Sequence, residues 1–308
     1  MVSCFVFADP NSLWSFCPNI GAAYLLTFLF ALTTVTHLAQ AIIYRKGYCW
    51  VIICSGLAQT ICYIFRVLSI QHPFSFSDYA AWFILILIAP LLTNAFAYMV
   101  MGRMVYNFTK EAKIFGVKAW RFTLYFVLLD ITAFLIQVAG AATASQNNLS
   151  NGQELRDLHI YQGGVALQQI FIFVFVAASI KFHRIFAKES PTAKKAQALR
   201  LLYAVYAVLM LITLRILFRI AEYSKGLTST IPNHEAYQYC LDSLPMLVAL
   251  VLFNVVHPGV IMAGKESDFP SRKERKNMSP RTISEDDMMV LPTTEPVLTT
   301  SQLNKAQG

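Results

Sequence analysis

Residues 81–92 read AWFILILIAPLL, an apolar run that contains no charged side chain. Residues 201–214, LLYAVYAVLMLITL, form a second run of the same kind. Both are continuous, whereas the strands of a membrane β-barrel are about ten residues long and alternate between apolar and polar side chains. They therefore predict transmembrane helices, each of which needs about 20 apolar residues to cross a hydrocarbon core about 30 Å thick.

The composition of the whole chain agrees with these runs. Of its 308 residues, 56% are hydrophobic and only 14% are charged, and a soluble domain of this size could not bury so much apolar surface. The predicted spans are residues 20–43, 48–70, 80–104, 122–144, 162–182, 199–221 and 238–262. The fold class is thus an all-α integral membrane protein with seven transmembrane helices in residues 20–262, after a short extracellular N-terminus at 1–19.

Basic residues are divided unequally between the two sets of loops. Twenty of the 25 Lys and Arg residues follow spans one, three, five and seven, whereas the opposite loops hold only Arg156 and Lys225. Since cytosolic loops carry the excess of basic residues, the N-terminus is predicted to lie outside the cytosol and the C-terminus inside it. The net charge of +8 then reflects topology and predicts no nucleic-acid partner.

The two termini differ in character. The first nineteen residues contain no Lys or Arg, so the basic region of a cleavable signal peptide is missing and the first span is predicted to be retained. Residues 263–308 are polar and rich in Ser, Thr and Pro, which predicts a disordered cytosolic tail. Its basic cluster of Arg272, Lys273, Arg275 and Lys276 is predicted to contact anionic inner-leaflet lipid, although a merely solvated tail would show the same charges.

The six cysteines contain no CxxC pair, so no metal site is predicted. Cys4, Cys17 and Cys240 lie at the predicted outer face, where oxidising conditions permit a disulfide, and their spacing leaves the pairing open. The other three lie inside the second span, where they are interpreted as small apolar side chains.

Polar side chains inside the spans need a reason, because a charge at the bilayer centre costs at least about 2.5 to 3.5 kcal/mol. By depth, Arg66, Gln137, Arg215, Arg219, Glu222 and Asp242 fall in the outer half, and His37, Asp130 and His257 fall in the inner half. The outer layer counts three positive and two negative charges, which suggests a polar vestibule with one cation left over for an anionic headgroup. The alternative is that these groups only pair with one another and hold the helices together.

Ten residues are the candidate ligand-binding residues. They are Arg66, Asp130, Gln137, Gln168, Arg215, Arg219, Glu222, Glu235, Asp242 and His257.

Several stretches of the sequence resemble those of a known protein family. They are IAPLLTNAFAYMVMGR in the third span, LDITAFLIQVAGAA in the fourth, YQGGVALQQIFIF in the fifth, and LRILFRIAEYSKG, HEAYQYCLDSLPM and HPG in the last two. Over residues 20–262 the chain resembles the fungal lipid-translocating exporter family, named for resistance to aminocholesterol. That family usually carries a glutamate in its second helix where this chain has Gln59, so the carboxylate is lost here.

The resemblance implies transport or extrusion of amphiphilic lipids, such as sphingoid-base or sterol-like compounds, with resistance to toxic amphiphiles. It implies a plasma membrane protein, with the vacuole or endoplasmic reticulum as alternatives. A different class of function is a seven-helix receptor or stress sensor that binds a lipid and signals to a cytosolic partner.

The chain contains no GxxxxGK[ST] string, so no nucleotide cofactor is predicted and transport would be facilitated, gradient-coupled or dependent on another protein. No GxSxG or HExxH string is present either, which predicts that the protein is not an enzyme.

The topology makes a prediction about glycosylation. Asn148-Leu149-Ser150 is a sequon in the predicted outer loop between spans four and five, whereas Asn107-Phe108-Thr109 lies on the predicted cytosolic side. Glycosidase treatment should increase electrophoretic mobility, and Asn148→Gln should abolish that shift while Asn107→Gln leaves it intact. A glycan on Asn107 would reverse the predicted orientation.

Overall fold

The computed structural model describes residues 4–9, 11–144, 151–189, 192–222, 224 and 231–270. In these ranges, seven helices are long and apolar enough to cross a membrane. The long helices are α1 (Ile20–Tyr44), α2 (Trp50–Gln71), α3 (Phe76–Phe108), α4 (Ala119–Ala144), α5 (Asn151–Glu189) and α6 (Thr192–Glu222). The seventh span joins α7 (Glu235–Gln238), the π-helical turn η3 (Tyr239–Ser243) and α8 (Leu244–Val255).

Short elements lie between and beside the spans. They are η1 (Cys4–Ala8), η2 (Gly47–Cys49), the antiparallel strands β1 (Lys113–Ile114) and β2 (Val117–Lys118), α9 (Pro258–Ile261) and η4 (Lys265–Ser267).

The predicted seven-helix fold is confirmed, but several boundaries were wrong. Among them, α5 ends at Glu189 and not at residue 182, and α6 begins at Thr192 and not at residue 199. The helix α5 begins at Asn151 and not at residue 162, because its first turns are polar and a search for apolar runs passes over them. The predicted span 238–262 is not one helix, since α8 ends at Val255 and His257 is extended with ψ of 124°. The cause is Pro258, because the residue before a proline avoids the helical conformation.

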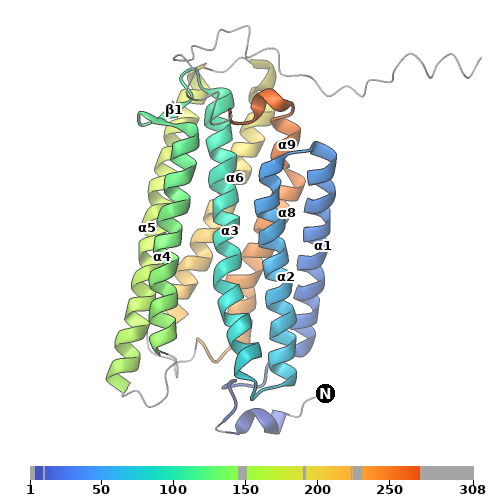
Figure 1. The fold of residues 1–308 in the computed structure, drawn as a ribbon, viewed down its shortest axis with the longest axis vertical. Coiled ribbons are helices and arrows are strands. Elements are labelled where there is room, and N and C mark those ends of the chain that lie inside the picture. Colours follow the sequence, from blue (N-terminus) through green and yellow to red (C-terminus); the bar gives the residue numbers. More distant parts are fainter. Residues whose placement is uncertain are drawn as a thin grey trace, which may run out of the picture.

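The helices form a closed antiparallel bundle (Figure 1). Consecutive spans pack against each other, and α8 closes the bundle by packing on both α1 and α6. In Figure 1, α3 lies in the middle, between the α1–α2 pair and the α4–α5 pair. It also touches α6 and α8, so it lies beside most of the polar residues described below.

The pair α4 and α5 is held unusually close. A Cβ atom at Gly140 would lie 2.4 Å from the backbone nitrogen of Tyr161, and one at Gly164 would lie 2.8 Å from Cγ of Gln137. Small residues allow such close approach between membrane helices, where dispersion forces replace the hydrophobic effect. The two helices therefore pack as one hairpin.

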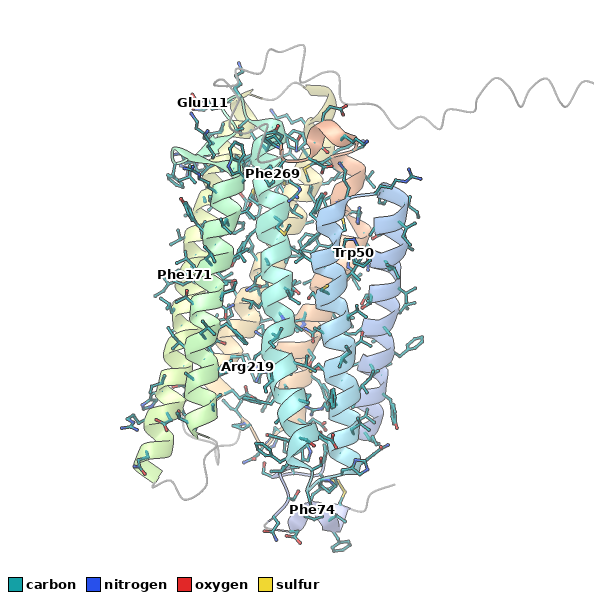
Figure 2. All side chains as sticks on the ribbon, in the orientation of Figure 1. Trp50, Phe74, Glu111, Phe171, Arg219 and Phe269 are labelled. Atoms are coloured by element: carbon teal, nitrogen blue, oxygen red, sulfur yellow. A yellow bond between two sulfur atoms is a disulfide. The ribbon has the colours of Figure 1, made fainter. Side chains whose placement is uncertain are left out.

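The two described ends of the chain lie at opposite ends of the bundle, which we call its N-terminal and C-terminal ends. Figure 2 labels Phe74 near the first of these and Phe269 near the second. Large apolar side chains such as Phe28, Leu32 and Val35 are exposed along the length of α1, as expected for a surface in contact with lipid.

A folded segment covers the N-terminal end of the bundle, and we call its described residues between Cys4 and Asn19 the lid. The pairing that the sequence left open is Cys4–Cys17, and Cys240 is free and exposed. The lid inserts the buried Trp14, whose Nε1 donates to the carbonyl oxygen of Ser69 at 3.1 Å. The lid is thus part of the fold.

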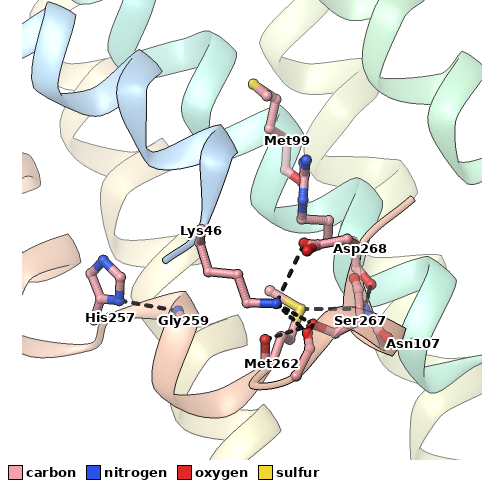
Figure 3. Close-up of polar contacts among 10 residues, drawn as sticks. Lys46, Met99, Asn107, His257, Gly259, Met262, Ser267 and Asp268 are labelled. Carbon is pink, nitrogen blue, oxygen red and sulfur yellow. Dashed lines mark hydrogen bonds and ion pairs between the residues drawn. The ribbon is translucent and has the colours of Figure 1, made fainter. Parts of the chain in front are cut away.

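The C-terminal end is covered by residues 263–270, which we call the strap. Lys46 Nζ donates to the carbonyl oxygen of Gly264 at 2.5 Å and to Ser267 Oγ at 2.7 Å, and it lies 3.4 Å from Asp268 Oδ1 (Figure 3). Asn107 Nδ2 donates to the carbonyl oxygen of Ser267 at 3.1 Å. The lysine is almost completely buried by these contacts.

The predicted disordered tail therefore does not begin at residue 263, because the strap packs against the bundle as far as residue 270. An aromatic contact contributes: the ring of Phe269 packs on Tyr106 and Trp120 and receives the guanidinium of Arg103 at 4.7 Å. The basic cluster Arg272, Lys273, Arg275 and Lys276 and the sequon residue Asn148 lie outside the described residues.

The strap gives a prediction about truncation. A chain that ends at residue 270 should keep the thermal stability of the full chain, whereas one that ends at residue 262 should lose about 2 kcal/mol or more, because Lys46 loses its acceptors. Melting of the purified protein in detergent measures both. In a Lys46→Met background the shorter truncation should cost clearly less. Equal losses in both backgrounds would show that the lysine does not hold the strap.

Candidate functional site

Four charged side chains form an ion-pair cluster in the half of the bundle nearer its N-terminal end, where Figure 2 labels Arg219. Asp242 bridges two arginines: its Oδ1 lies 2.5 Å from Arg215 Nε and its Oδ2 lies 2.5 Å from Arg219 Nη2. Arg219 Nη1 also contacts Glu222 at 2.9 Å. Arg215 Nη2 donates to the carbonyl oxygen of Ile86 at 2.8 Å, so the cluster ties α6 to α3 as well as to the seventh span.

Local helix geometry brings the ion-pair cluster together. Arg215, Arg219 and Glu222 follow one another at steps of four and three residues, so they share one face of α6. Asp242 belongs to the π-helical turn η3, which is wider than an α-helical turn and is a feature often found at functional sites. All four side chains are buried, and each has an opposite charge as its partner.

Beside this cluster, Arg66 of α2 lies in an aromatic box. The guanidinium carbon is 4.9 Å from the ring centre of Trp14, 4.9 Å from that of Trp82 and 4.8 Å from that of Tyr239. These distances are within the range of cation–π attraction. One wall of the box is the lid residue Trp14, so the lid and the polar interior are directly connected.

Each nitrogen of the same guanidinium donates a hydrogen bond. It donates to Tyr239 Oη at 2.9 Å, to Gln238 Oε1 at 2.8 Å and to Glu235 Oε1 at 2.8 Å. The second oxygen of Glu235 accepts from the lid, through the backbone nitrogen of Asn19 at 2.7 Å. Arg66 has no exposed surface at all, so none of its donors faces water.

The prediction of a spare cation is wrong for the described residues. Once Glu235 is included, Arg66, Arg215 and Arg219 face three carboxylates, and every one of these charges has a partner. The five charges that the sequence placed in one outer layer form two adjacent groups, because Arg66 pairs with Glu235 and not with Asp242. The expected vestibule is also covered, since Trp14 packs over Arg66.

A third polar group lies deeper in the bundle and contains a different kind of carboxyl. Asp130 of α4 is 1% exposed, and its Oδ2 accepts from Asn94 Nδ2 at 3.1 Å and from Tyr98 Oη at 2.9 Å. Gln168 of α5 lies beside the same carboxyl and accepts from Gln137 Nε2 at 3.0 Å. We call these five residues the midplane carboxyl group.

The two histidines near the C-terminal end have local roles. His37 Nε2 lies 3.1 Å from the carbonyl oxygen of Leu250 and connects α1 to α8. His257 caps α9, since its Nδ1 accepts from the backbone nitrogen of Gly259 at 3.1 Å, and its ring stacks on Tyr44. In the part of the chain that the structure describes, no three His, Cys, Asp or Glu side chains gather as metal ligands would.

Sequence reasoning missed several of the residues that complete these groups. Asn94 and Tyr98 are four residues apart on α3, and this spacing could have marked a polar face. No local signal could have found Trp14, because it lies outside the predicted spans and meets Arg66 only through the fold of the lid.

Comparison with known proteins identifies the family to which the chain is similar. The family described as "RTA1 like protein" matches residues 52–265. A protein of Emericella nidulans named probable lipid transporter atnI is 37% identical over 270 residues, which cover 83% of this chain and 70% of that protein. No solved structure matches the chain.

Two proteins of Saccharomyces cerevisiae are also similar. Protoporphyrin uptake protein 1 is 30% identical over 206 residues, which cover 65% of each chain. Sphingoid long-chain base transporter RSB1 is 22% identical over 307 residues, which cover 85% of this chain and 78% of that protein.

The ion-pair cluster predicts an order of mutational effects. Asp242→Asn should cost about 3 to 5 kcal/mol, because it leaves the buried Arg215 without a carboxylate and removes one of the two carboxylates of Arg219. Glu222→Gln should cost less, about 1 to 2 kcal/mol, because Arg219 keeps its contact with Asp242. Thermal unfolding of the purified variants measures both.

The double variant provides the control for this order. Adding Arg215→Gln to Asp242→Asn should restore part of the lost stability, because it removes the arginine that the first change leaves without a carboxylate. Additive losses in the double variant would mean that the two side chains do not interact.

Proposed function

The chain belongs to the RTA1 like protein family, and from this we propose that it moves amphiphilic lipids across or out of a membrane. The names of its relatives support this proposal: one is a probable lipid transporter, another transports sphingoid long-chain bases, and a third takes up protoporphyrin. All three names refer to the movement of molecules that combine an apolar body with a polar or charged group. We therefore assign sphingoid-base-like and sterol-like amphiphiles as the substrate class.

One observation in the structure supports the proposal: the bundle buries three polar groups within its apolar core and exposes apolar side chains on its outer surface. These groups are the midplane carboxyl group, the ion-pair cluster and the aromatic box. Intramembrane ionisable residues generally face the interior of a bundle and mark the pathway of a substrate or ion. A polar headgroup could follow such an interior while its hydrocarbon chain stays in lipid.

The ten candidate residues then divide by role. Arg66, Arg215, Arg219, Glu222, Glu235 and Asp242 are paired with one another and hold the helices and the lid in place. His257 caps a helix at the far end of the bundle. We assign contact with a passing headgroup to Asp130, Gln137 and Gln168. Among the described residues, none of these three has an oppositely charged partner.

We further propose that the lid faces outward from the cytosol and that the protein acts at the plasma membrane. The disulfide Cys4–Cys17 supports an oxidising compartment for the lid, and the excess of basic residues lies on the opposite side. The relatives are named as transporters and not as enzymes, which supports a function without catalysis.

Reconstitution tests the function. We expect liposomes that contain the purified full chain to move a fluorescent sphingoid base between leaflets faster than protein-free liposomes, with no nucleotide present. A variant at an exposed, lipid-facing position, Cys54→Ala, should behave as the unmodified protein does. If folded protein moves neither sphingoid bases, sterols nor phospholipids, the transport proposal fails and the receptor alternative gains support.

A further inference from the structure

Asp130 differs from the other buried carboxylates of the described chain. Asp157, Glu222 and Asp242 each have a basic partner within 3.4 Å. The polar neighbours of Asp130 are an amide on α3, a phenol on α3 and an amide on α5, and none of them carries a positive charge. Among the described residues, Asp130 is therefore the one buried carboxyl without a basic partner.

The hydrogen bonds around Asp130 are also incomplete. Its Oδ1 has no well-formed hydrogen bond to any described residue, and the same is true of the side-chain oxygen of the adjacent Asn94. Both belong to side chains with only 1% of their surface exposed, and both are acceptors when the carboxyl is ionised. A buried acceptor without a donor costs about 1 to 3 kcal/mol, so an ionised Asp130 needs a further donor, which a proton on the carboxyl would supply.

The depth of Asp130 adds a physical reason for its presence. It lies eleven residues after the first residue of α4, a helix of 26 residues, so it is about 17 Å along a helix about 39 Å long. This is close to the middle of the span, where a charge is least stable. A carboxylate without a cation could not persist there, so in this conformation the carboxyl holds a proton.

We infer that Asp130 is the binding group for a cationic headgroup, which exchanges with the proton that the carboxyl holds. The substrate class is a long-chain primary amine, and this inference rests on the proposed function. When the ammonium group arrives, the carboxyl releases its proton to water and the carboxylate forms an ion pair with the ammonium. Charge is conserved, because one positive charge enters as one leaves.

This placement lowers the barrier that matters most for lipid movement. The headgroup of an amphiphile that crosses the bilayer is least stable at the midplane, and Asp130 supplies the compensating charge at that depth. Once the proton has left, the ammonium would provide donors to the oxygens of Asp130 and Asn94 that have no other partner. The groups that face the carboxyl from the packed helices are Asn94 and Tyr98 on α3 and Gln168 on α5, of which only Tyr98 can titrate.

The exchange can be measured directly on the full chain in lipid nanodiscs. The probes are a C18 sphingoid base and its N-acetylated form, which has the same chain but no positive charge. We expect the base to bind with release of about one proton per molecule, detected with a pH indicator in weakly buffered solution. The N-acetylated form should bind about 30-fold more weakly or worse, because it cannot pair with the carboxylate.

Two variants complete the test. Asp130→Asn keeps the size of the side chain, and it should bind the base about 30-fold more weakly and release no proton. The control is Asp157→Asn, which alters another buried carboxyl, one that already has Arg156 as its partner, and should leave binding and proton release unchanged.

Binding of the base without proton release by the unmodified protein would overturn the inference, and this result does not depend on whether any variant folds. Unchanged affinity in folded Asp130→Asn would also overturn it. Lipid movement in liposomes together with either result would leave the proposed function standing. Proton-coupled binding in a protein that moves no lipid would support the site and overturn transport.

Discussion

The salt bridges from Asp242 to Arg215 and Arg219 are the interaction on which the rest of the bundle depends. The hydrocarbon core offers no water to solvate a charge, so each charge inside it needs an internal partner. One carboxylate that serves two arginines joins α6 to the π-helical turn of the seventh span, and the bond from Arg215 to Ile86 adds α3. The two last spans are thereby fixed to each other and to α3, which is distant from them in sequence.

The same constraint explains why both ends of the bundle are covered. Arg66 lies near the N-terminal end, where water could compete for its hydrogen bonds, and the lid excludes water by placing Trp14 against it. Lys46 lies at the other end, and the strap surrounds its ammonium with a carbonyl oxygen, a hydroxyl and a carboxylate. Each covering segment therefore packs against a buried cation of the bundle.

The sequence was sufficient for the seven spans, because an apolar run of about 20 residues is a local signal. It also placed the ion-pair cluster in one layer, since depth follows from helix direction and rise. The sequence could not show which charged side chains pair with each other. Arg66 and Glu235 are 169 residues apart, and Glu235 lies outside the predicted span. Leaving it out of the charge count produced the spare cation. The strap was missed for a similar reason, because its order comes from Lys46, more than 200 residues away.

The free energies of the polar contacts indicate where the helices of this bundle can separate most easily. Separating Asp242 from its arginines would leave buried charges unpaired, at a cost of about 3 to 5 kcal/mol for each broken pair. Separating α4 from α3 at Asp130 would break hydrogen bonds of a carboxyl to an amide and a phenol, each worth about 1 kcal/mol. The close contacts at Gly140 and Gly164 keep α4 and α5 together as a hairpin. The polar contacts between α3 and this hairpin are therefore weaker than those of the ion-pair cluster, and this interface is also where Asp130, the buried carboxyl without a basic partner, lies.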